Sequence, residues 1–389
     1  MPMSWESISL AEAFRPLKSS PFTRDELNYS GGQYQNVHYG DILVRFPSVV
    51  AADKEGLPFV NESSEGRCSH CSLLQNGDII IADTAEDEAV GKAIEIQGIE
   101  EQKIVSGLHT MAFRPQEGMF APGFLGYFLN SSVYHNQLLP LMQGIKVLSI
   151  SKTAIGDTVI KYPSFDEQKK IVSALSGVDD MIGALDEAIA KRRHIKEGLM
   201  QQLLTGKTRL PGFSGEWKER RMDSFEIING SMLKSSEYET GNVPVIAGGQ
   251  TPAGFHSIAN RPANTITISG SGAYAGFVSF HTIPIFASDC STINNPKNVD
   301  IIYLYFCLLS KQNEIYKCQA GGAQPHVHAK DIKDITIMVP SSVEEQKAIS
   351  SVLTKSDDEI KGLEAQRDKY TLIKQGMMQE LLTGKTRLI

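Results

Sequence analysis

The sequence has no long apolar segment, little cysteine and no excess of basic residues. No run of about 18 apolar residues is present, so we expect no transmembrane helix. The first residues, Met1 to Glu6, lack a basic stretch followed by an apolar one, which argues against a secretory signal. The five cysteines are an odd number without framework spacing, which predicts free thiols and a cytoplasmic protein.

The formal net charge of −7 at pH 7 argues against a simple basic DNA-binding protein. Residues 1–162 carry 12 Lys and Arg against 19 Asp and Glu, and residues 211–341 carry 10 against 11. Any affinity for DNA would therefore depend on a local basic patch or on partner proteins.

Motifs for nucleotide binding, metal binding and catalysis are incomplete. Residues 205–208, Thr-Gly-Lys-Thr, resemble the end of a P-loop, but Gln201 stands where its first glycine belongs. Residues 68–71, Cys-Ser-His-Cys, offer at most three of the four ligands of a structural zinc site. Residues 294–297, Asn-Asn-Pro-Lys, lack the second proline and the aromatic residue of an adenine methyltransferase motif. We therefore expect no catalytic residues, no cofactor and no metal in this chain.

A long internal repeat is present. Residues 165–210 align with 343–388 at a constant offset of 178, without a gap, and 24 of the 46 positions are identical. Both copies contain Glu-Gln-Lys near the start, an Asp-Asp pair, and Leu-Leu-Thr-Gly-Lys-Thr-Arg-Leu at the end. The chain therefore consists of two half-proteins in tandem, each a variable region followed by a repeated segment.

The repeated segment is predicted to form one long helix of about 40 residues, roughly 60 Å in length. Its apolar residues alternate at spacings of four and three, which is a coiled-coil seam. The first copy places Ile171, Leu175, Val178, Ile182, Leu185, Ile189, Leu199 and Leu203 on this seam. Serines at 164 and 342 have N-cap spacing to glutamates at 167 and 345, and glycines at 206 and 384 are suited to end the helices.

Two such helices in one chain can bury their stripes against each other, and the globular region between them favours an antiparallel pair. Lys196 and Lys374 occupy matched seam positions. They either extend toward solvent or fix the register of the pair.

The variable regions, 1–162 and 211–341, show short β-like runs between turns. We expect a strand after each of the turns at Gly40 and Gly77, within 40–44 and 77–81. In the second region, strands at 264–268 and 276–280 flank a glycine-rich tip, and helices are expected near 120–142 and 300–317. Each region is therefore expected to be a mixed α+β domain.

The ends of the two variable regions correspond. Gly144-Ile145-Lys146 matches Gly322-Ala323-Gln324 at the offset of 178. Further on, the matching positions are one residue out of phase with this offset: Ile150, Ile155, Ile160 and Pro163 match Val327, Ile332, Ile337 and Pro340. Similar ends with divergent interiors indicate a common scaffold for two different recognition surfaces.

Several segments resemble the specificity subunits of type I restriction–modification enzymes, over nearly the whole chain. They are the Glu-Gln-Lys-Lys-Ile opening, the long seam and the Leu-Leu-Thr-Gly-Lys close of the repeat, together with Phe-Ser-Gly-Glu-Trp at 213–217 and the glycine-rich segments 245–254, 272–278 and 321–325. The resemblance implies a non-catalytic subunit with two target-recognition domains separated by two antiparallel coiled-coil helices. It implies that each domain binds one half of an interrupted DNA site, while the helices bind two methyltransferase subunits, which join restriction subunits.

On this interpretation the domains are 1–162 and 218–341, the helices are 163–206 and 342–389, and 207–217 is a linker. Two alternatives stay open. One is the specificity subunit of a related type II enzyme that cuts on both sides of an interrupted site, and the other is a coiled-coil adaptor that binds only proteins.

Base-reading side chains must be polar and able to reach the edges of the DNA grooves. Polar loops supply the candidates. In the first domain they are Gln33, Tyr34, Asn36, His38, Lys92, His109 and Lys146. In the second domain they are Lys234, Gln250, His256, Arg261, Ser271, Tyr274, Gln324 and His326.

Overall fold

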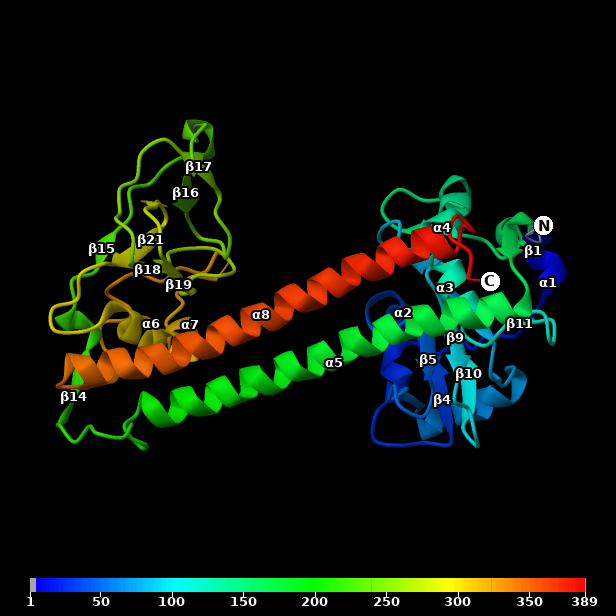
Figure 1. Ribbon diagram of the computed structural model, residues 1–389, viewed down its shortest axis with the longest axis horizontal. Coiled ribbons are helices and arrows are strands. Elements are labelled where there is room, and N and C mark those ends of the chain that lie inside the picture. The colour runs from blue at the N-terminus through cyan, green and yellow to red at the C-terminus, as the bar shows by residue number, and fades with distance from the viewer. Residues whose placement is uncertain (1–4, 239, 323, 389) are drawn as a thin grey trace. The chain divides into compact units, whose positions relative to one another are not determined.

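The computed structural model describes residues 5–238, 240–322 and 324–388 (Figure 1). The chain divides into two units. Unit 1 comprises Met1–Ala184 and Arg367–Ile389, and unit 2 comprises Leu185–Gln366. Two long helices, α5 (Phe165–Leu203) and α8 (Val343–Leu381), each contribute one half to each unit. The expected fold class is confirmed: two mixed α/β units share two long antiparallel helices.

Unit 1 contains a five-stranded sheet in the order β2-β11-β7-β9-β5 and a four-stranded sheet in the order β10-β4-β6-β3. Its strands are β1 (Glu6–Ser9), β2 (Phe14–Pro16), β3 (Leu27–Asn28), β4 (Tyr34–Val37), β5 (Val49–Ala51), β6 (Phe59–Val60), β7 (Ile79–Ala82), β8 (Thr84–Ala85), β9 (Ala93–Gln97), β10 (Lys103–Ser106), β11 (Thr110–Pro115), β12 (Leu148–Ser149) and β13 (Val159–Tyr162). Its short helices are α1 (Leu10–Ala13), α2 (Tyr39–Val44), α3 (Phe124–Leu129) and α4 (Ser132–Leu138), with 3-10 turns at Arg24–Glu26, Glu62–His70, Leu139–Leu141 and Ala154–Asp157.

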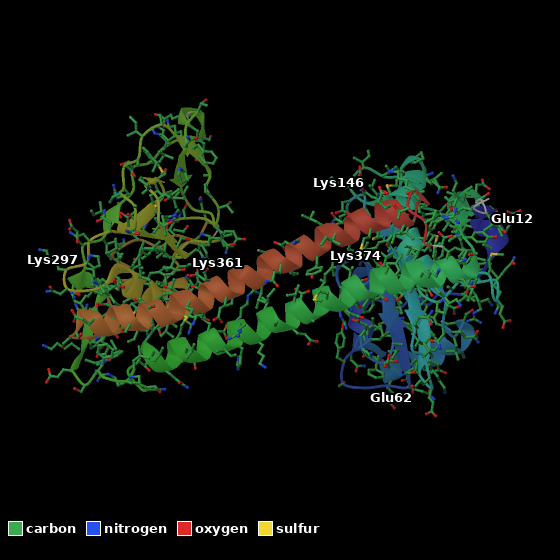
Figure 2. All side chains as sticks on the ribbon, in the orientation of Figure 1. Glu12, Glu62, Lys146, Lys297, Lys361 and Lys374 are labelled. Atoms are coloured by element: carbon green, nitrogen blue, oxygen red, sulfur yellow. The ribbon has the colours of Figure 1, made fainter. Side chains whose placement is uncertain are left out.

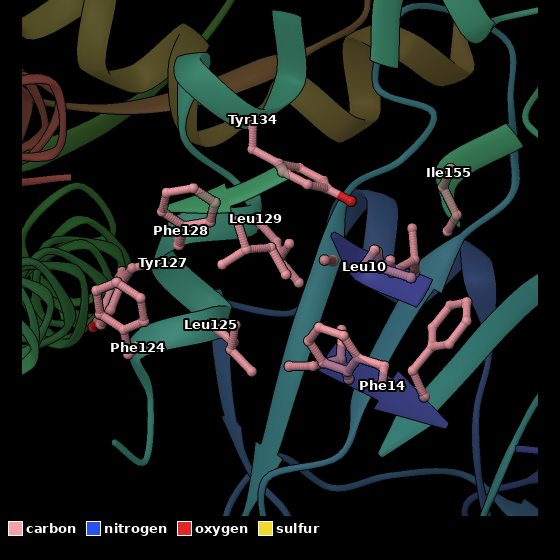
Figure 3. Packing of buried hydrophobic residues seen from close by; sticks show 14 of the residues in the cluster. Leu10, Phe14, Phe124, Leu125, Tyr127, Phe128, Leu129, Tyr134 and Ile155 are labelled. Atoms are coloured by element: carbon pink, nitrogen blue, oxygen red, sulfur yellow. The ribbon is translucent and has the colours of Figure 1, made fainter. Parts of the chain in front are cut away.

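The main core of unit 1 lies between the five-stranded sheet, the helices α3 and α4, and the start of α5. Aromatic side chains of α3 and α4 pack among aliphatic ones in this core (Figure 3). The rings of Phe124 and Phe128 on α3 are 5.9 Å apart, and the ring of Tyr134 on α4 lies 6.0 Å from that of Phe128. Ile171 and Leu175, the first seam residues of α5, are completely buried in the same core. The seam therefore anchors the helix to its domain.

One expected strand is wrong. Residues 40–44 lie in the helix α2, whereas residues 79–82 form the expected strand β7. The imidazole Nδ1 of His38 accepts a hydrogen bond from the amide of Gly40 at 3.1 Å and caps this helix. Asp41 accepts two hydrogen bonds from the guanidinium of Arg24. These polar contacts stabilise a helical turn that the apolar run Ile-Leu-Val did not indicate.

Unit 2 contains a four-stranded sheet in the order β15-β21-β18-β19 and a three-stranded sheet in the order β17-β16-β20. Its strands are β14 (Trp217–Arg221), β15 (Ile228–Asn229), β16 (Val243–Ile246), β17 (Gly254–His256), β18 (Thr265–Ser269), β19 (Val278–His281), β20 (Phe286–Ala287), β21 (Cys290–Ile293) and β22 (Thr336–Pro340). Its helices are α6 (Ile301–Ser310) and α7 (Gln312–Lys317), with 3-10 turns at Met222–Ser224 and Ser235–Glu237. The helices expected late in each region are thus confirmed.

The two units are built on a common frame. In unit 1, β7 pairs with β9 and β11, and in unit 2, β18 pairs with β19 and β21. A glycine with positive φ follows each central strand, Gly91 in unit 1 and Gly276 in unit 2, and side chains of the late helix and of the following loop pack against it. The pairs in contact are Leu138 and Ile150 in unit 1, and Ile315 and Val327 in unit 2. Both pairs are related by an offset of 177, so the correspondence seen at the ends of the variable regions is structural.

The long helices begin and end as the sequence indicates. The hydroxyls of Ser164 and Ser342 accept hydrogen bonds from the amides of Glu167 and Glu345, three residues on. At the other end, Gly206 and Gly384 have φ of 71° and 72°, the left-handed conformation typical of a helix C-cap. The glutamate side chains, however, do not complete capping boxes, because each pairs with an arginine.

Those arginines come from the end of the opposite repeat. Arg387 donates to Glu167 at 2.6 and 2.7 Å within unit 1, and Arg209 donates to Glu345 at 2.6 and 2.7 Å within unit 2. Both carboxylate side chains are almost completely buried, with 4% and 1% of their surface exposed. The two ion pairs are related by the repeat offset of 178, so each unit has an antiparallel pair of helix halves closed by the same contact.

The seam lysines form a second reciprocal set. Lys374 pairs with Asp179 at 2.6 Å in unit 1, and Lys196 pairs with Asp357 in unit 2. Each ammonium group also lies 5.5 Å from an aromatic ring, that of Tyr127 in unit 1 and of Phe306 in unit 2. The lysine side chains are only 20% and 15% exposed, so they are held between the helices rather than extended into solvent. No helix within the described residues has the length and apolarity needed to cross a membrane.

Candidate nucleic-acid interface

A tight hairpin forms one edge of unit 1. The backbones of Gln143 and Ser149 exchange hydrogen bonds of 2.9 and 2.8 Å. Gly144 has φ of 122°, and a side chain there would collide with the carbonyl oxygen of Val147, so this turn requires glycine. The returning strand β12 pairs with β8, which fixes the hairpin to the segment that follows the central strand β7.

The tip of this hairpin is exposed. Ile145 is 100% exposed and Val147 is 51% exposed, with the exposed Lys146 between them. Lys146 lies on a loop that projects from unit 1 (Figure 2). A positive charge between two apolar side chains is thus presented to solvent on a hydrogen-bonded support.

His109 lies next to the base of the hairpin. Its ring Nδ1 is 3.5 Å from Asp83 Oδ1 and 3.5 Å from the hydroxyl of Thr84, whose backbone pairs with Ser149. His109 has φ of 53°, a conformation that is uncommon outside glycine and often marks a functional loop. Its ring also contacts that of Tyr39 at 5.3 Å. The structure therefore brings His109 and the hairpin of Lys146 together.

His38 lies beneath this surface. Its side chain is buried, its ring lies 4.7 Å from that of Tyr39 in a tilted arrangement, and its Nδ1 caps α2. Burial, reinforced by the positive charge of Arg24, lowers the pKa of His38 below its usual value. We therefore expect His38 to hold α2 and Tyr39 in place and not to contact a ligand itself.

The other candidates of unit 1 lie apart or are internal. Tyr34 begins β4 of the four-stranded sheet, and its ring lies 5.4 Å from the ammonium of Lys103. Gln33 is exposed in the loop just before this strand. Asn36 is completely buried and donates to the hydroxyl of Ser20. Lys92 donates to the carbonyl of Leu43 at 3.0 Å, and burial together with the charge of Lys374 lowers its pKa.

Unit 2 has an equivalent hairpin. The backbones of Ala320 and His326 exchange hydrogen bonds of 3.0 and 2.8 Å, and Gly321 has φ of 99° with the carbonyl oxygen of Gln324 close to where a side chain would lie. Ser271 forms a β-bridge with His326, as Thr84 pairs with Ser149 in unit 1. Gln324 is exposed on this hairpin. Ser271, Gln324 and His326 are therefore brought together.

Asp289 occupies the position in unit 2 that His109 occupies in unit 1. The residue after each central strand donates its amide to the carbonyl of this residue, Asp83 to His109 and Gly270 to Asp289. The side chain of Asp289 accepts a hydrogen bond from the hydroxyl of Ser271. The same structural position thus carries an imidazole in one unit and a carboxylate in the other.

Two further candidates lie near this hairpin. Tyr274, in the glycine-rich tip, is 45% exposed. Gln250 is exposed on the loop after β16. In the same loop, Gly248 packs closely on Ser271, whose carbonyl oxygen lies 2.4 Å from where a side chain on Gly248 would begin. Gln250 also lines a groove of about 480 Å³ whose inner wall includes Ser269, a buried hydroxyl without a hydrogen-bond partner.

The remaining candidates of unit 2 have other surroundings. Arg261 is held by its own fold: its guanidinium donates to the hydroxyl of Thr292 and to the carbonyls of Asn260 and Asn229, at 2.7–2.8 Å. The ring of His256 lies 4.8 Å from that of Phe286. Lys234 is exposed at the start of a 3-10 turn.

Sequence reasoning missed Asp83, Tyr39 and Asp289. Their positions follow from strand pairing that joins residues far apart in the chain. In the sequence, a polar loop begins at Thr84, directly after Asp83, and this loop was the available signal for a role in binding. Nothing in the sequence indicated that Asp289 is the counterpart of His109, because the spacing between the shared strands differs in the two units.

The family model of the type I restriction modification DNA specificity domain matches residues 215–369. The chain is 25% identical over 344 residues to a Methanocaldococcus jannaschii protein provisionally named the type I restriction enzyme MjaX specificity subunit, covering 80% of this chain and 79% of that protein. The MjaVIII specificity subunit of the same organism is 22% identical over 282 residues, 63% of this chain and 66% of that protein.

Two solved structures share the fold. The S subunit of a type I restriction–modification system from M. genitalium gives a TM-score of 0.64 at 16% identity, over 97% of this chain and 96% of that chain. A chain from structural work on the assembly and conformational transition of the type I R-M system gives 0.58 at 18% identity, over 98% of both chains. Residues 215–369 thus match the type I DNA specificity domain, and the chain is similar in sequence and fold to type I specificity subunits over most of its length.

Proposed function

We propose that this chain is the DNA specificity subunit of a type I restriction–modification system, in which each unit reads one half of an interrupted DNA site. The observation that carries the proposal is the pair of equivalent hairpins. Both are closed by the same backbone hydrogen bonds around a left-handed glycine, and both adjoin the residue after the central strand. Two hairpins with the same backbone structure and different tip residues are suited to the recognition of two different DNA sequences.

The side chains at these hairpins can make the hydrogen bonds by which proteins recognise DNA bases. Lys146 and His109 can donate to acceptors on a base or a phosphate, and Gln324 offers an amide that can bind adenine in two places. Asp289 can accept from cytosine if Ser271 releases it. We propose Lys146, His109, Gln324, His326, Ser271 and Tyr274 as the first residues to test, followed by Gln250.

We further propose that the helices bind two methyltransferase subunits. Exposed apolar side chains lie on both helices: Phe165, Met181, Leu372 and Ile373 in unit 1, and Ile195 in unit 2. The reciprocal ion pairs give each unit an equivalent pair of helix halves. Ile195 and Ile373 are related by the repeat offset of 178, so two copies of one partner would each meet one of them. The partners would also supply basic surface that this chain, with its charge of −7, lacks.

On this proposal methyl transfer and cleavage belong to the partners. The described residues contain no group of three or more His, Cys, Asp or Glu placed to hold a metal ion. Calorimetry of the lone chain with a methyl donor tests this point, and we expect no heat of binding.

Methylation mapping tests the main proposal. DNA from cells that express this chain with its methyltransferase should carry methylation at one interrupted, two-part sequence, and DNA from cells with the methyltransferase alone should not. Methylation that is independent of this chain, or a continuous target site, would contradict the proposal.

A further inference from the structure

The two hairpin tips are equivalent in structure and different in chemistry. Gly144 corresponds to Gly321 at an offset of 177, because both begin the turn and both approach a carbonyl oxygen three residues on. The structural correspondence therefore differs by one residue from the sequence alignment, which matched Gly144 with Gly322. In this alignment Ile145 of unit 1 is equivalent to Gly322 of unit 2, and Val147 is equivalent to Gln324.

The apolar tip of unit 1 has no partner within its unit. Ile145 is 100% exposed, so it contributes nothing to the core, while a polar residue would occupy the same position without exposing apolar surface. Single exposed apolar residues are common on proteins. Here, however, two of them flank a lysine at the end of a hairpin that is fixed by backbone pairing to the candidate surface of His109.

We infer that the hairpin of unit 1 enters the major groove of the first half-site and that Ile145 contacts the C5 methyl group of a thymine. This inference rests on the proposed function. The major groove admits a two-stranded β-ribbon, and β12 with β8 continues the hairpin as such a ribbon. The thymine methyl is the one apolar group that distinguishes bases in that groove, and it is recognised by apolar side chains.

The neighbours of Ile145 fit this placement. Lys146 beside it can reach a phosphate or a guanine edge, and His109 and Thr84 at the base of the hairpin offer hydrogen bonds to the adjoining base pair. In unit 2 the described tip residues, Gly322 and Gln324, offer no large apolar side chain. Methyl recognition by the tip is therefore proposed for the first half-site.

A thermodynamic cycle on the complex assembled with its methyltransferase tests the inference. Once the methylation map gives the target, each thymine of the first half-site is replaced in turn by deoxyuridine, which removes only the methyl group. For the parent complex we expect one such replacement to weaken binding about fourfold, the value of one buried methyl. With Ile145→Ala, the thymine and deoxyuridine sites should bind equally.

Leu73→Ala is the matched control, because Leu73 is an exposed apolar residue of the same unit outside the hairpin. It should keep the full discrimination of the parent complex. If the complex binds its site specifically but no thymine is coupled to Ile145, the inference is wrong. Strong fluorescence of 2-aminopurine next to the tip would also overturn it, since it would show a wedge between unstacked bases. A complex without any sequence-specific binding would instead reject the proposed function.

Discussion

At the scale of single residues, the buried glutamates at the helix starts have the largest expected effect on stability. Glu345 loses its hydration in the fold and regains polar contacts from Arg209. Arg209→Ala should therefore lower the free energy of unfolding by about 3 kcal/mol, because it leaves a buried carboxylate without its partner. Urea denaturation monitored on the full chain measures this loss.

Arg192→Ala is the control for that experiment. Arg192 also pairs with a glutamate, Glu359, across the same two helices, but the two side chains are 50% and 40% exposed. Removal of an exposed pair should cost less than about 1 kcal/mol. Equal losses for the two variants would show that burial of Glu345 does not set the strength of its pair.

The equivalent pair in unit 1 makes stability depend on pH. Hydrogen bonds from Arg387 lower the pKa of Glu167 below its ordinary value of 4.5. A carboxyl with a lowered pKa in the folded state binds its proton more readily when unfolded, so its contribution is present above pH 4.5 and disappears as the pH falls through the folded value. The difference in unfolding free energy between the parent and Glu167→Gln should be constant near neutrality and narrow below pH 4.5. A difference that stays constant down to pH 3 would contradict this account.

Arg261, a candidate for base contact by its sequence, is engaged in contacts within unit 2. Its three hydrogen bonds to Thr292, Asn260 and Asn229 hold the loop before β18 against two neighbouring strands. We expect Arg261→Ala to destabilise unit 2 by about 1–3 kcal/mol, whereas Gln324→Ala should leave the melting temperature unchanged and alter only the methylated sequence. Thermal melting of the two variants beside their methylation maps separates a structural residue from a base reader.

At the scale of elements, we predict that the lysines within the seam fix the antiparallel register of the helices. Lys196 and Asp357 are both largely buried, so a like-charge pair there is costly. Lys196→Asp should destabilise unit 2 by several kcal/mol, and the exchanged variant, Lys196→Asp with Asp357→Lys, should recover much of the loss. Recovery demonstrates a direct pairing. No recovery in the exchanged variant would mean that the lysine acts through its contact with Phe306 or through packing alone.

The seam leucines give a second expectation at this scale. Leu185 is 8% exposed and Leu363 is partly buried. A charged residue at Leu185 would be buried without a partner and should lower the unfolding free energy by several kcal/mol, with a smaller effect at Leu363. Melting curves of Leu185→Asp and Leu363→Asp that match the parent would exclude close packing of the helices at these positions.

At the scale of the whole molecule, the two-part organisation predicts separable specificity. Replacement of residues 218–335 by those of a relative should change one half of the methylated sequence and leave the other half intact. Lengthening the linker, 207–217, should change the unread spacer between the halves. A methylation map in which the replacement alters both halves would contradict independent readers.

The charge of the chain gives a further prediction at this scale. Neutralisation of phosphates supplies most non-specific affinity for DNA, and this chain carries −7. The lone chain should therefore bind DNA weakly at physiological salt, and the assembled complex should bind tightly. Titration of one labelled duplex with each species measures the difference, and tight specific binding by the lone chain would reject a need for partners.

The sequence alone determined those features that repeat or that depend on neighbours in the chain. The gapless repeat and its four-three spacing predicted both long helices, and the serines and glycines at their ends predicted where they begin and stop, because capping involves residues only a few positions apart. Lys196 and Lys374 were recognised as seam residues for the same reason. Local apolar patterns predicted the late helices of the variable regions. They also predicted strands within 77–81 and at 264–268, which are β7 and β18 of the structure.

Only the tertiary structure decided which distant residues meet. Glu167, Glu345 and the seam lysines each find their partner in the other copy of the repeat, far away along the chain. Nothing local selects an ion pair over a capping box. The helix α2 replaced an expected strand because Arg24 and His38, from outside the run, stabilise its turn. The candidate surface likewise depends on strand pairing, which brings His109 next to the hairpin of Lys146. The spacing between these segments differs in the two units, so their contact left no pattern in the sequence.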